Sequence, residues 1–223
     1  MIKIIWLIYT LAGLDGFSQS YDFKVRYGVI YAGSAELSYT LVDGILKSSL
    51  TIASSPWLSN LWTLTDSISS TYHLETGRLK THYKAIHEGS YHRNYMVEFG
   101  DSNQVQINDS EKVVEETNFK DLPSLLYDLS QYQFRDGDTL QFSLWDGRSY
   151  GMLMLVVEKV GKPKLFTPFA LSGWKLTPLS STDKSRENRI QLALHLSNTR
   201  PHIPLRIEID TKYGGVLMRL EDP

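Results

Sequence analysis

The sequence contains no cysteine. Without thiols the chain can form no disulfide, no thiolate metal site and no lipoprotein anchor through an N-terminal cysteine. The formal net charge is only −2, from 23 Lys and Arg residues and 25 Asp and Glu residues, and no basic cluster occurs along the sequence. Nucleic acids and anionic membrane surfaces bind through basic patches, so we expect neither as a partner.

Catalytic signatures are missing as well. No Gly-x-Ser-x-Gly motif occurs, which excludes the nucleophile turn of the α/β-hydrolases. The glycines at Gly28 and Gly33 are not followed by the Lys-Ser or Lys-Thr of a phosphate-binding loop. Asp136, Asp138 and Asp146 each lie beside a glycine, and turn formation explains them without paired-carboxylate catalysis. We therefore expect no catalytic residue and no cofactor.

Three histidines recur every five residues, at His82, His87 and His92. On strands an odd spacing places neighbours on opposite faces, and a turn at 88–90 separates the second histidine from the third. A three-histidine metal site would need an unusual cross-strand arrangement. We favour ordinary surface or cross-strand histidines and predict no metal site.

No apolar run is long enough to span a bilayer. The longest at the N-terminus, Ile4 to Leu14, follows Lys3 and precedes the small residues Gly16 and Ser18. This layout predicts a signal peptide at residues 1–18 with cleavage before Gln19, in preference to a buried first strand or a membrane anchor. We expect a periplasmic or secreted protein with no transmembrane span after cleavage.

Roughly two hundred residues would remain after cleavage, enough for one domain with a real core. Alternating apolar and polar residues recur in short segments separated by turns, which predicts an all-β, mainly antiparallel fold of roughly ten to twelve strands. Asp43-Gly44 joins two of these strands and has the chemistry of a type I′ hairpin turn, in which both residues need positive φ. We expect residues 19–223 to form a single curved sheet or open β-barrel.

One segment has helical periodicity in this β-patterned chain. Leu122, Leu125, Leu126 and Leu129 share one helical face, and Asp121 stands at the N-cap position. The apolar face needs a surface to cover, so we expect the helix to lie on the curved sheet as a plug or lid. A charge at Leu125 should then be severely destabilising. Asp in place of Lys120, just outside the helix, should change the stability by less than about 0.5 kcal/mol.

A second, shorter helix is predicted at Ser55-Pro56, with Trp57, Leu58, Leu61 and Trp62 on its apolar face. This aromatic cluster is interpreted as a cap on the barrel end, as a lid over an apolar cavity, or as a membrane-facing or partner-facing patch. If it is a lid, the two helices would cover one ligand cavity. The candidate ligand-binding residues are then Trp57, Leu61, Trp62, Leu125, Leu129 and Tyr27.

The segment from 202 to 211 alternates strictly. Ile207 and Ile209 are predicted to face one side, and His202, Arg206 and Glu208 the other. If the sheet is filled by its own side chains, this polar face is the candidate contact surface for an envelope protein partner.

The order of these parts resembles a bacterial exported family, domain of unknown function 3108 (DUF3108). The resemblance rests on Tyr27-Gly28 and Ala32-Gly33, the short aromatic helix, the leucine helix at 122–129, the turns at 135–138 and 145–147, and Pro204-Leu205-Arg206. It implies a periplasmic or surface-associated β-domain and no established activity. Two functions stay open: a binding module for a hydrophobic or amphipathic ligand such as a lipid, and a structural or assembly protein that docks a partner.

Overall fold

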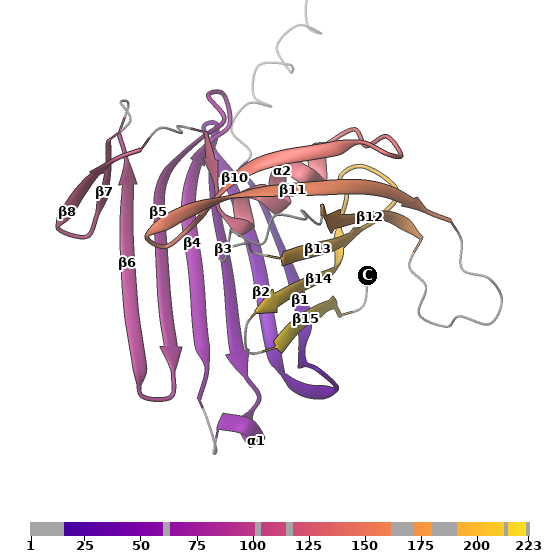
Figure 1. Cartoon of the computed structure of the whole chain (residues 1–223), viewed down its shortest axis with the longest axis horizontal. Coiled ribbons are helices and arrows are strands. Elements are labelled where there is room, and N and C mark those ends of the chain that lie inside the picture. The colour runs from indigo at the N-terminus through magenta and orange to yellow at the C-terminus, as the bar shows by residue number, and fades with distance from the viewer. Residues whose placement is uncertain are drawn as a thin grey trace, which may run out of the picture.

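The structure is a computed structural model, and it describes residues 16–59, 63–100, 104–114, 118–161, 172–179, 191–211 and 214–221. Within these ranges fifteen strands form one sheet, in the order β8-β7-β6-β5-β4-β3-β2-β1-β15-β14-β13-β12-β11-β10-β9. Almost every neighbouring pair is antiparallel (Figure 1). The predicted all-β fold with a curved, open sheet is confirmed. Neither helix in the described part of the chain is both long and apolar enough to cross a lipid bilayer.

The N-terminal half forms a regular meander of long strands followed by a short edge hairpin. Its elements are β1 (Phe17–Tyr27), β2 (Ile30–Val42), β3 (Ile45–Ser54), α1 (Pro56–Ser59), β4 (Thr65–His73), β5 (Arg78–Glu88), β6 (Tyr91–Phe99), β7 (Gln104–Ile107) and β8 (Ser110–Val113).

The C-terminal half begins with a two-residue strand and the interior helix, and its later strands are added to the sheet in an order that ends beside β1. Its elements are β9 (Phe119–Lys120), α2 (Leu122–Gln131), β10 (Thr139–Asp146), β11 (Ser149–Val160), β12 (Gly173–Pro178), β13 (Gln191–Leu196), β14 (Pro204–Thr211) and β15 (Gly214–Leu220). β15 pairs with β1, so the two halves share one continuous sheet.

Local turn chemistry is confirmed at the β2–β3 hairpin. Asp43 and Gly44 both have positive φ, at 51° and 75°, as a type I′ turn requires. Gly33 is needed for a different reason, because a Cβ there would lie 1.9 Å from the carbonyl oxygen of Ala53 on β3. The bend expected between Gly28 and Gly33 appears as a register shift opposite Val25 and Arg26 on β1.

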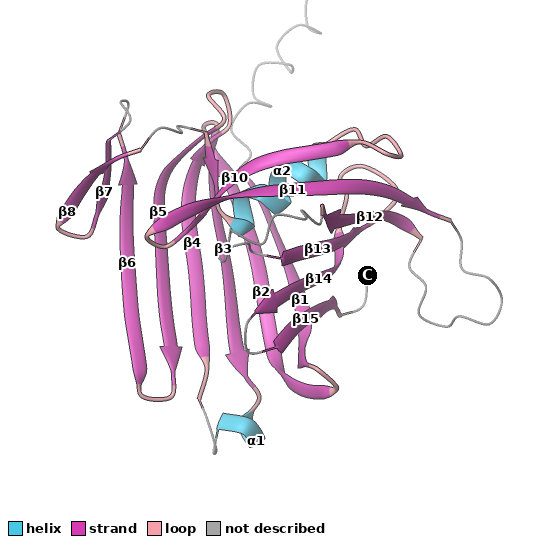
Figure 2. Ribbon diagram, viewed as in Figure 1, coloured by secondary structure: helices cyan, strands magenta, loops and turns pink. Residues whose placement is uncertain are grey.

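Among the described residues, the sheet rolls up without pairing its two edges, β8 and β9. β9 runs parallel to β10, with Phe119 opposite Ser143 and Lys120 opposite Leu144. Successive residues of a strand point to opposite faces, and both faces of β9 are covered. The Phe119 ring packs on Phe99 of β6 at 5.5 Å, whereas the Lys120 ammonium lies over a β4 ring. The β9 edge is therefore packed against the N-terminal strands. Figure 2 shows that the strands of the C-terminal half run across the direction of the long N-terminal strands.

The helix α2 lies in the concave side of this roll, where the two halves of the sheet face each other (Figure 1). Leu125, Leu126 and Leu129 are 0–1 % exposed and belong to the same core cluster as inner-face residues of both halves. The predicted leucine face is thus confirmed as core. The short strands β8 and β9 were not predicted. The four residues of β8 are all exposed and show no alternation, and the two residues of β9 are too few to show any periodicity.

Candidate functional site

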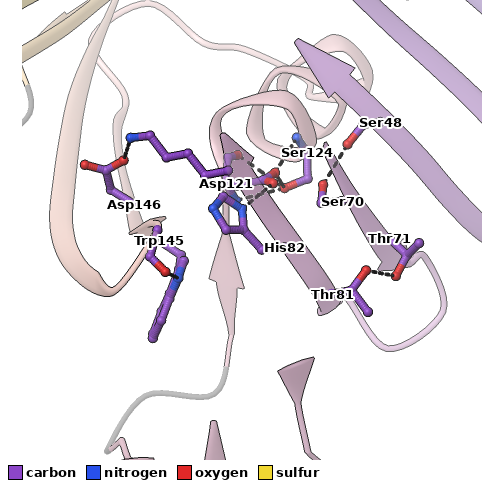
Figure 3. A network of polar contacts seen from close by, with 11 residues as sticks. Ser48, Ser70, Thr71, Thr81, His82, Asp121, Ser124, Trp145 and Asp146 are labelled. Carbon is purple, nitrogen blue, oxygen red and sulfur yellow. Dashed lines mark hydrogen bonds and ion pairs between the residues drawn. The ribbon is translucent and has the colours of Figure 1, made fainter. Parts of the chain in front are cut away.

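A row of buried polar side chains crosses the inner face of the sheet beneath the first turn of α2. Ser48 on β3 is opposite Ser70 on β4, and Ser70 is opposite His82 on β5. The hydroxyls of Ser48 and Ser70 are 2.9 Å apart and hydrogen-bonded (Figure 3). Next to Ser48, the Tyr39 hydroxyl donates to the carbonyl of Pro123 in α2 at 3.2 Å. This row gives the helix end a polar surface inside an otherwise apolar core.

Asp121 joins the helix to that row. As the N-cap of α2, its Oδ1 accepts hydrogen bonds from the backbone N–H and the hydroxyl of Ser124, at 3.0 and 2.6 Å. Its Oδ2 lies 3.0 Å from Nδ1 of His82 (Figure 3). Asp121 and Ser124 are fully buried and His82 is 1 % exposed. The residues thus form one interior cluster, the Asp121–His82 anchor.

The charge of this anchor follows from its contacts. Burial by itself raises the pKa of Asp121, but the hydrogen bond and charge of His82 and the two bonds from Ser124 outweigh it and lower that pKa. The carboxylate is therefore ionised and accepts a hydrogen bond from the Nδ1–H of His82. Nε2 of His82 is buried and has no hydrogen-bond partner among the described residues.

The anchor does not have the geometry of a catalytic triad. In a triad the serine hydroxyl contacts the histidine nitrogen that is not bonded to the acid. Here the hydroxyl of Ser124 donates to Asp121 instead, and no serine bonds Nε2 of His82 among the described residues. The arrangement holds α2 on the sheet, and we assign it a positioning role.

Lys120 corrects a prediction made from the sequence. Its ammonium makes an ion pair with Asp128 at 2.6 Å, donates to the carbonyl of Gly77 at 3.2 Å and lies 3.9 Å from the centre of the Tyr72 ring. The residue is only 6 % exposed. The expectation that Asp is tolerated here is wrong, because the substitution would bury a second carboxylate beside Asp128.

An open cleft of about 520 Å³ lies between α2 and β10, and we call it the α2–β10 cleft. Its lining includes Asp128, Leu129 and Gln131 from the helix side and Gln141, Phe142 and Met152 from the sheet side. The lining therefore combines apolar groups with amides and both partners of the Lys120–Asp128 ion pair.

A second, smaller cleft of about 330 Å³ lies on the opposite side of α2, against β1 and β2. Tyr21, Tyr39 and Tyr127 line it, and their rings meet edge to face, with centroids 6.3 and 5.5 Å apart. Gln131 lines both clefts, so the C-terminal end of α2 separates them.

The ligand-binding residues predicted from the sequence do not come together. Leu129 lines the α2–β10 cleft, whereas the side chain of Leu125 is buried in the hydrophobic core between α2 and the sheet. Trp57 and Tyr27 are 50 % and 43 % exposed at the other end of the sheet. Leu61 and Trp62 lie outside the described residues.

The separation of Trp57 from the cleft follows from the strand between them. α2 lies over Ser48 and its neighbours, whereas α1 begins after Ser54, six residues further along β3. Six residues of strand span about 20 Å. The two helices therefore do not cover one cavity.

The predicted partner face also needs correction at His202. This residue is 4 % exposed and lies before β14 begins. Its Nδ1 and Nε2 lie 2.8 and 3.1 Å from the carbonyl oxygens of Ser197 and Tyr132, so the ring ties the end of α2 to the β13–β14 connection.

A register shift causes the difference. Leu196 is opposite Pro204 while the preceding residue, His195, is opposite Arg206, which makes Leu205 an extra residue in β14. The alternation is interrupted there, so the residues before the bulge turn inward. Arg206 and Glu208 follow it, remain partly exposed and form an ion pair with each other at 2.8 Å.

The histidine series is divided between two places. His82 is inside the sheet, whereas the rings of His87 and His92 lie side by side across β5 and β6, with centroids 5.1 Å apart. Within the described ranges no group of three His, Asp or Glu residues is placed to hold a metal ion.

The sequence motifs that carry the family resemblance have structural roles. Trp145 at the tip of the β10–β11 hairpin donates from Nε1 to the carbonyl of Gly147 and packs on Phe119 and Phe99. The adjacent Asp146 forms an ion pair with Lys84 of β5 (Figure 3). The 145–147 turn therefore attaches the rolled half of the sheet to the meander.

Fold and site together define a class: a rolled, mainly antiparallel β-sheet protein with an interior helix anchored by a buried Asp–His pair. The chain belongs to the family described as protein of unknown function DUF3108, whose model matches residues 22–221.

Among solved structures, the chain is similar to the crystal structure of a β-barrel-like protein of domain of unknown function DUF1849 from Brucella abortus. The sequence identity is 10 %, the TM-score is 0.56, and the alignment covers 93 % of this chain and 96 % of that chain. At this identity the likeness shows the fold alone. No match to this sequence is found among the curated proteins.

Proposed function

We propose that this protein is a non-catalytic binding module of the cell envelope that holds a hydrophobic or amphipathic ligand in the α2–β10 cleft. The observation that carries the proposal is the cleft itself, about 520 Å³ in volume, between an anchored helix and a curved sheet. Small-molecule sites commonly measure about 300–1,000 Å³ and are largely preformed.

The lining suits a ligand with two kinds of surface. Phe142 and Met152 offer contacts for an alkyl or ring portion. Gln131 and Gln141 offer amide donors and acceptors for a polar portion. The Lys120–Asp128 pair is neutral as a unit and already satisfied, which argues against a strongly charged ligand.

A second function, an assembly protein that docks an envelope partner through its outer sheet surface, is favoured by one observation. The interior beneath α2 is filled by the protein's own side chains, with Leu125, Leu126 and Leu129 almost fully buried. If the interior has no room for a ligand, a partner protein would have to bind the outer surface or the ends of the rolled sheet. The Arg206–Glu208 pair is the remaining part of the predicted contact face.

Native mass spectrometry separates the two functions. Protein purified from its own envelope should retain a lipid-sized mass if the cleft is a binding site. We expect Gln141→Trp, which places an indole in the cleft from an exposed position, to abolish this adduct. The control Gln191→Trp changes an exposed glutamine on β13 outside the cleft and should keep it. A clean unliganded mass for the parent protein would favour the assembly function.

Export is part of the proposal. The order of Lys3, the apolar run 4–14 and the small residues Gly16 and Ser18 supports cleavage before Gln19. N-terminal sequencing of the envelope fraction should find Gln19 or a residue within a few positions as the first residue. Recovery of the protein with Met1 intact would contradict a cleaved signal peptide.

A further inference from the structure

We propose that one end of the sheet docks on a lipid bilayer by inserting side chains of the β1–β2 turn and of α1 into its interfacial layer. The docking end comprises Tyr27, Val29, Ile30, Tyr31 and Trp57. It lies at the opposite end of β3 from the α2–β10 cleft, so the inference does not depend on the proposed ligand.

Strand pairing places these residues together. β1 ends at Tyr27 opposite the start of β2 at Ile30, and Gly33 of β2 is opposite Ser54, the last residue of β3. The backbone N–H of Ser55 donates to the carbonyl of Ala32, which sets α1 beside the start of β2. The β1–β2 turn and α1 therefore project from the same end of the meander (Figure 1).

The apolar side chains at this end are exposed to an unusual degree. Val29 is 87 % exposed, Ile30 52 % and Trp57 50 %. Single exposed apolar residues are ordinary, but a cluster at one projecting end marks an interaction site. Two tyrosines flank the cluster, and tyrosine and tryptophan are the side chains that concentrate at bilayer interfaces.

The backbone of the turn is suited to an apolar environment. The guanidinium of Arg26 donates to the carbonyl of Val29 at 3.4 Å, and the N–H of Gly28 donates to the carbonyl of Gly215 at 3.3 Å. Polar backbone groups that enter a bilayer must be satisfied within the protein. These two contacts satisfy one carbonyl and one N–H of the turn within the protein, and its apolar side chains project to the outside. A partner strand would need unpaired backbone groups to bind, whereas a bilayer needs exposed apolar side chains, so the turn favours a bilayer.

Among the described residues, the charges at the docking end do not create a cationic surface. Arg26 lies near the turn, while Asp210 lies in the neighbouring β14. Further along the same end, Asp66 and Glu88 share a hydrogen bond, and burial followed by their mutual contact raises the pKa of Glu88. Binding is therefore expected to come from apolar insertion and to be insensitive to salt and to anionic lipid.

The test is flotation with phosphatidylcholine vesicles, using the protein as the cell processes it so that every variant has the same N-terminus. We expect the parent protein to float with the vesicles in both 0.1 M and 0.5 M NaCl. The double variant Val29→Asp/Ile30→Asp should partition about tenfold less, because it replaces the two most exposed apolar residues of the turn with carboxylates. The tryptophan fluorescence of the parent should be quenched by bromine on the lipid acyl chains, and Trp57→Phe should reduce this quenching.

The control is Val113→Asp, which changes an 80 % exposed valine on β8 at the opposite end of the sheet. It should partition as the parent does. All variants are first compared by urea unfolding, and Trp57→Ala provides a second test if the double variant is destabilised.

Failure of the parent to float, or equal partition of the parent and the folded double variant, would overturn the proposal. Binding that disappears in 0.5 M NaCl would also overturn it, because it would be electrostatic. Self-association that Val29→Asp/Ile30→Asp abolishes, without flotation of the parent, would assign this end to a second copy of the chain instead.

Discussion

The substitution Leu125→Asp is expected to abolish folding at ambient temperature. Leu125 is completely buried between α2 and the sheet. The variant loses the packing of a buried leucine, which is worth about 2–5 kcal/mol, and places a carboxylate in the hydrophobic core, which costs several kcal/mol more. The sum is comparable to the entire stability of a typical domain, about 5–15 kcal/mol. Urea unfolding followed by circular dichroism measures the loss.

Two controls accompany this variant. Val113→Asp makes the same kind of change at an exposed position and should alter the free energy of unfolding by less than about 0.5 kcal/mol. Leu125→Met keeps the volume and should cost less than about 1.5 kcal/mol. If Leu125→Asp and Val113→Asp unfold at the same urea concentration, α2 does not pack as described.

The second large effect is expected at Asp121. Asp121→Ala removes the N-cap of α2 and leaves the buried Nδ1–H of His82 and the backbone N–H of Ser124 without their acceptor. Leaving a buried donor without its acceptor costs about 1–3 kcal/mol, and the loss of an N-cap typically costs about 1 kcal/mol more. Asp121→Asn should cost less, because the amide oxygen still accepts hydrogen bonds but carries no charge.

The pH dependence distinguishes the charge from the cap. The folded-state pKa of Asp121 is lowered, so its ionised form contributes stability that is fully present above the unfolded pKa of about 3.9. This contribution is lost as the pH falls from that value through the lowered folded pKa. The difference in unfolding free energy between the parent and Asp121→Asn should therefore shrink as the pH falls below about 4.

An Asp121→Asn variant as stable as the parent at pH 7 would show that burial outweighs the hydrogen bonds from His82 and Ser124. A difference that stays unchanged down to pH 3 would mean that the pKa of Asp121 is the same in the folded and unfolded states and that its charge is not the cause.

Features governed by neighbouring residues were predictable. The Asp43-Gly44 turn needs only two adjacent residues that tolerate positive φ. The helix α2 follows from leucines at helical spacing after the N-cap Asp121. The turn at Arg135 to Asp138 has its own local bond, from the Arg135 N–H to the Asp138 carboxylate. Each of these is determined within a few residues of chain.

The environment of individual polar residues was not predictable. Lys120 precedes the N-cap of α2, and the residues around it show no apolar periodicity that would predict burial. It is nevertheless buried against Tyr72 and Gly77, which lie more than forty residues earlier in the chain. His82 is one of three evenly spaced histidines, and only its position opposite Asp121 distinguishes it. His202 turns inward because of the bulge at Leu205, and a single extra residue leaves no mark in the composition of a strand.

The sequence by itself determined the strand and helix types, the tight turns, the apolar face of α2 and the open all-β class. The reason is that turn geometry, capping and the periods of strand and helix depend on residues close in the chain. Tertiary structure alone decided how far the sheet rolls, that β9 is packed on both faces, and that α1 begins about 20 Å along β3 from Ser48, over which α2 lies. These features depend on the twist of the sheet, on a bulge and on contacts between distant segments. The alternation of a strand predicts which of its faces is apolar, but it does not predict which other segment packs on that face.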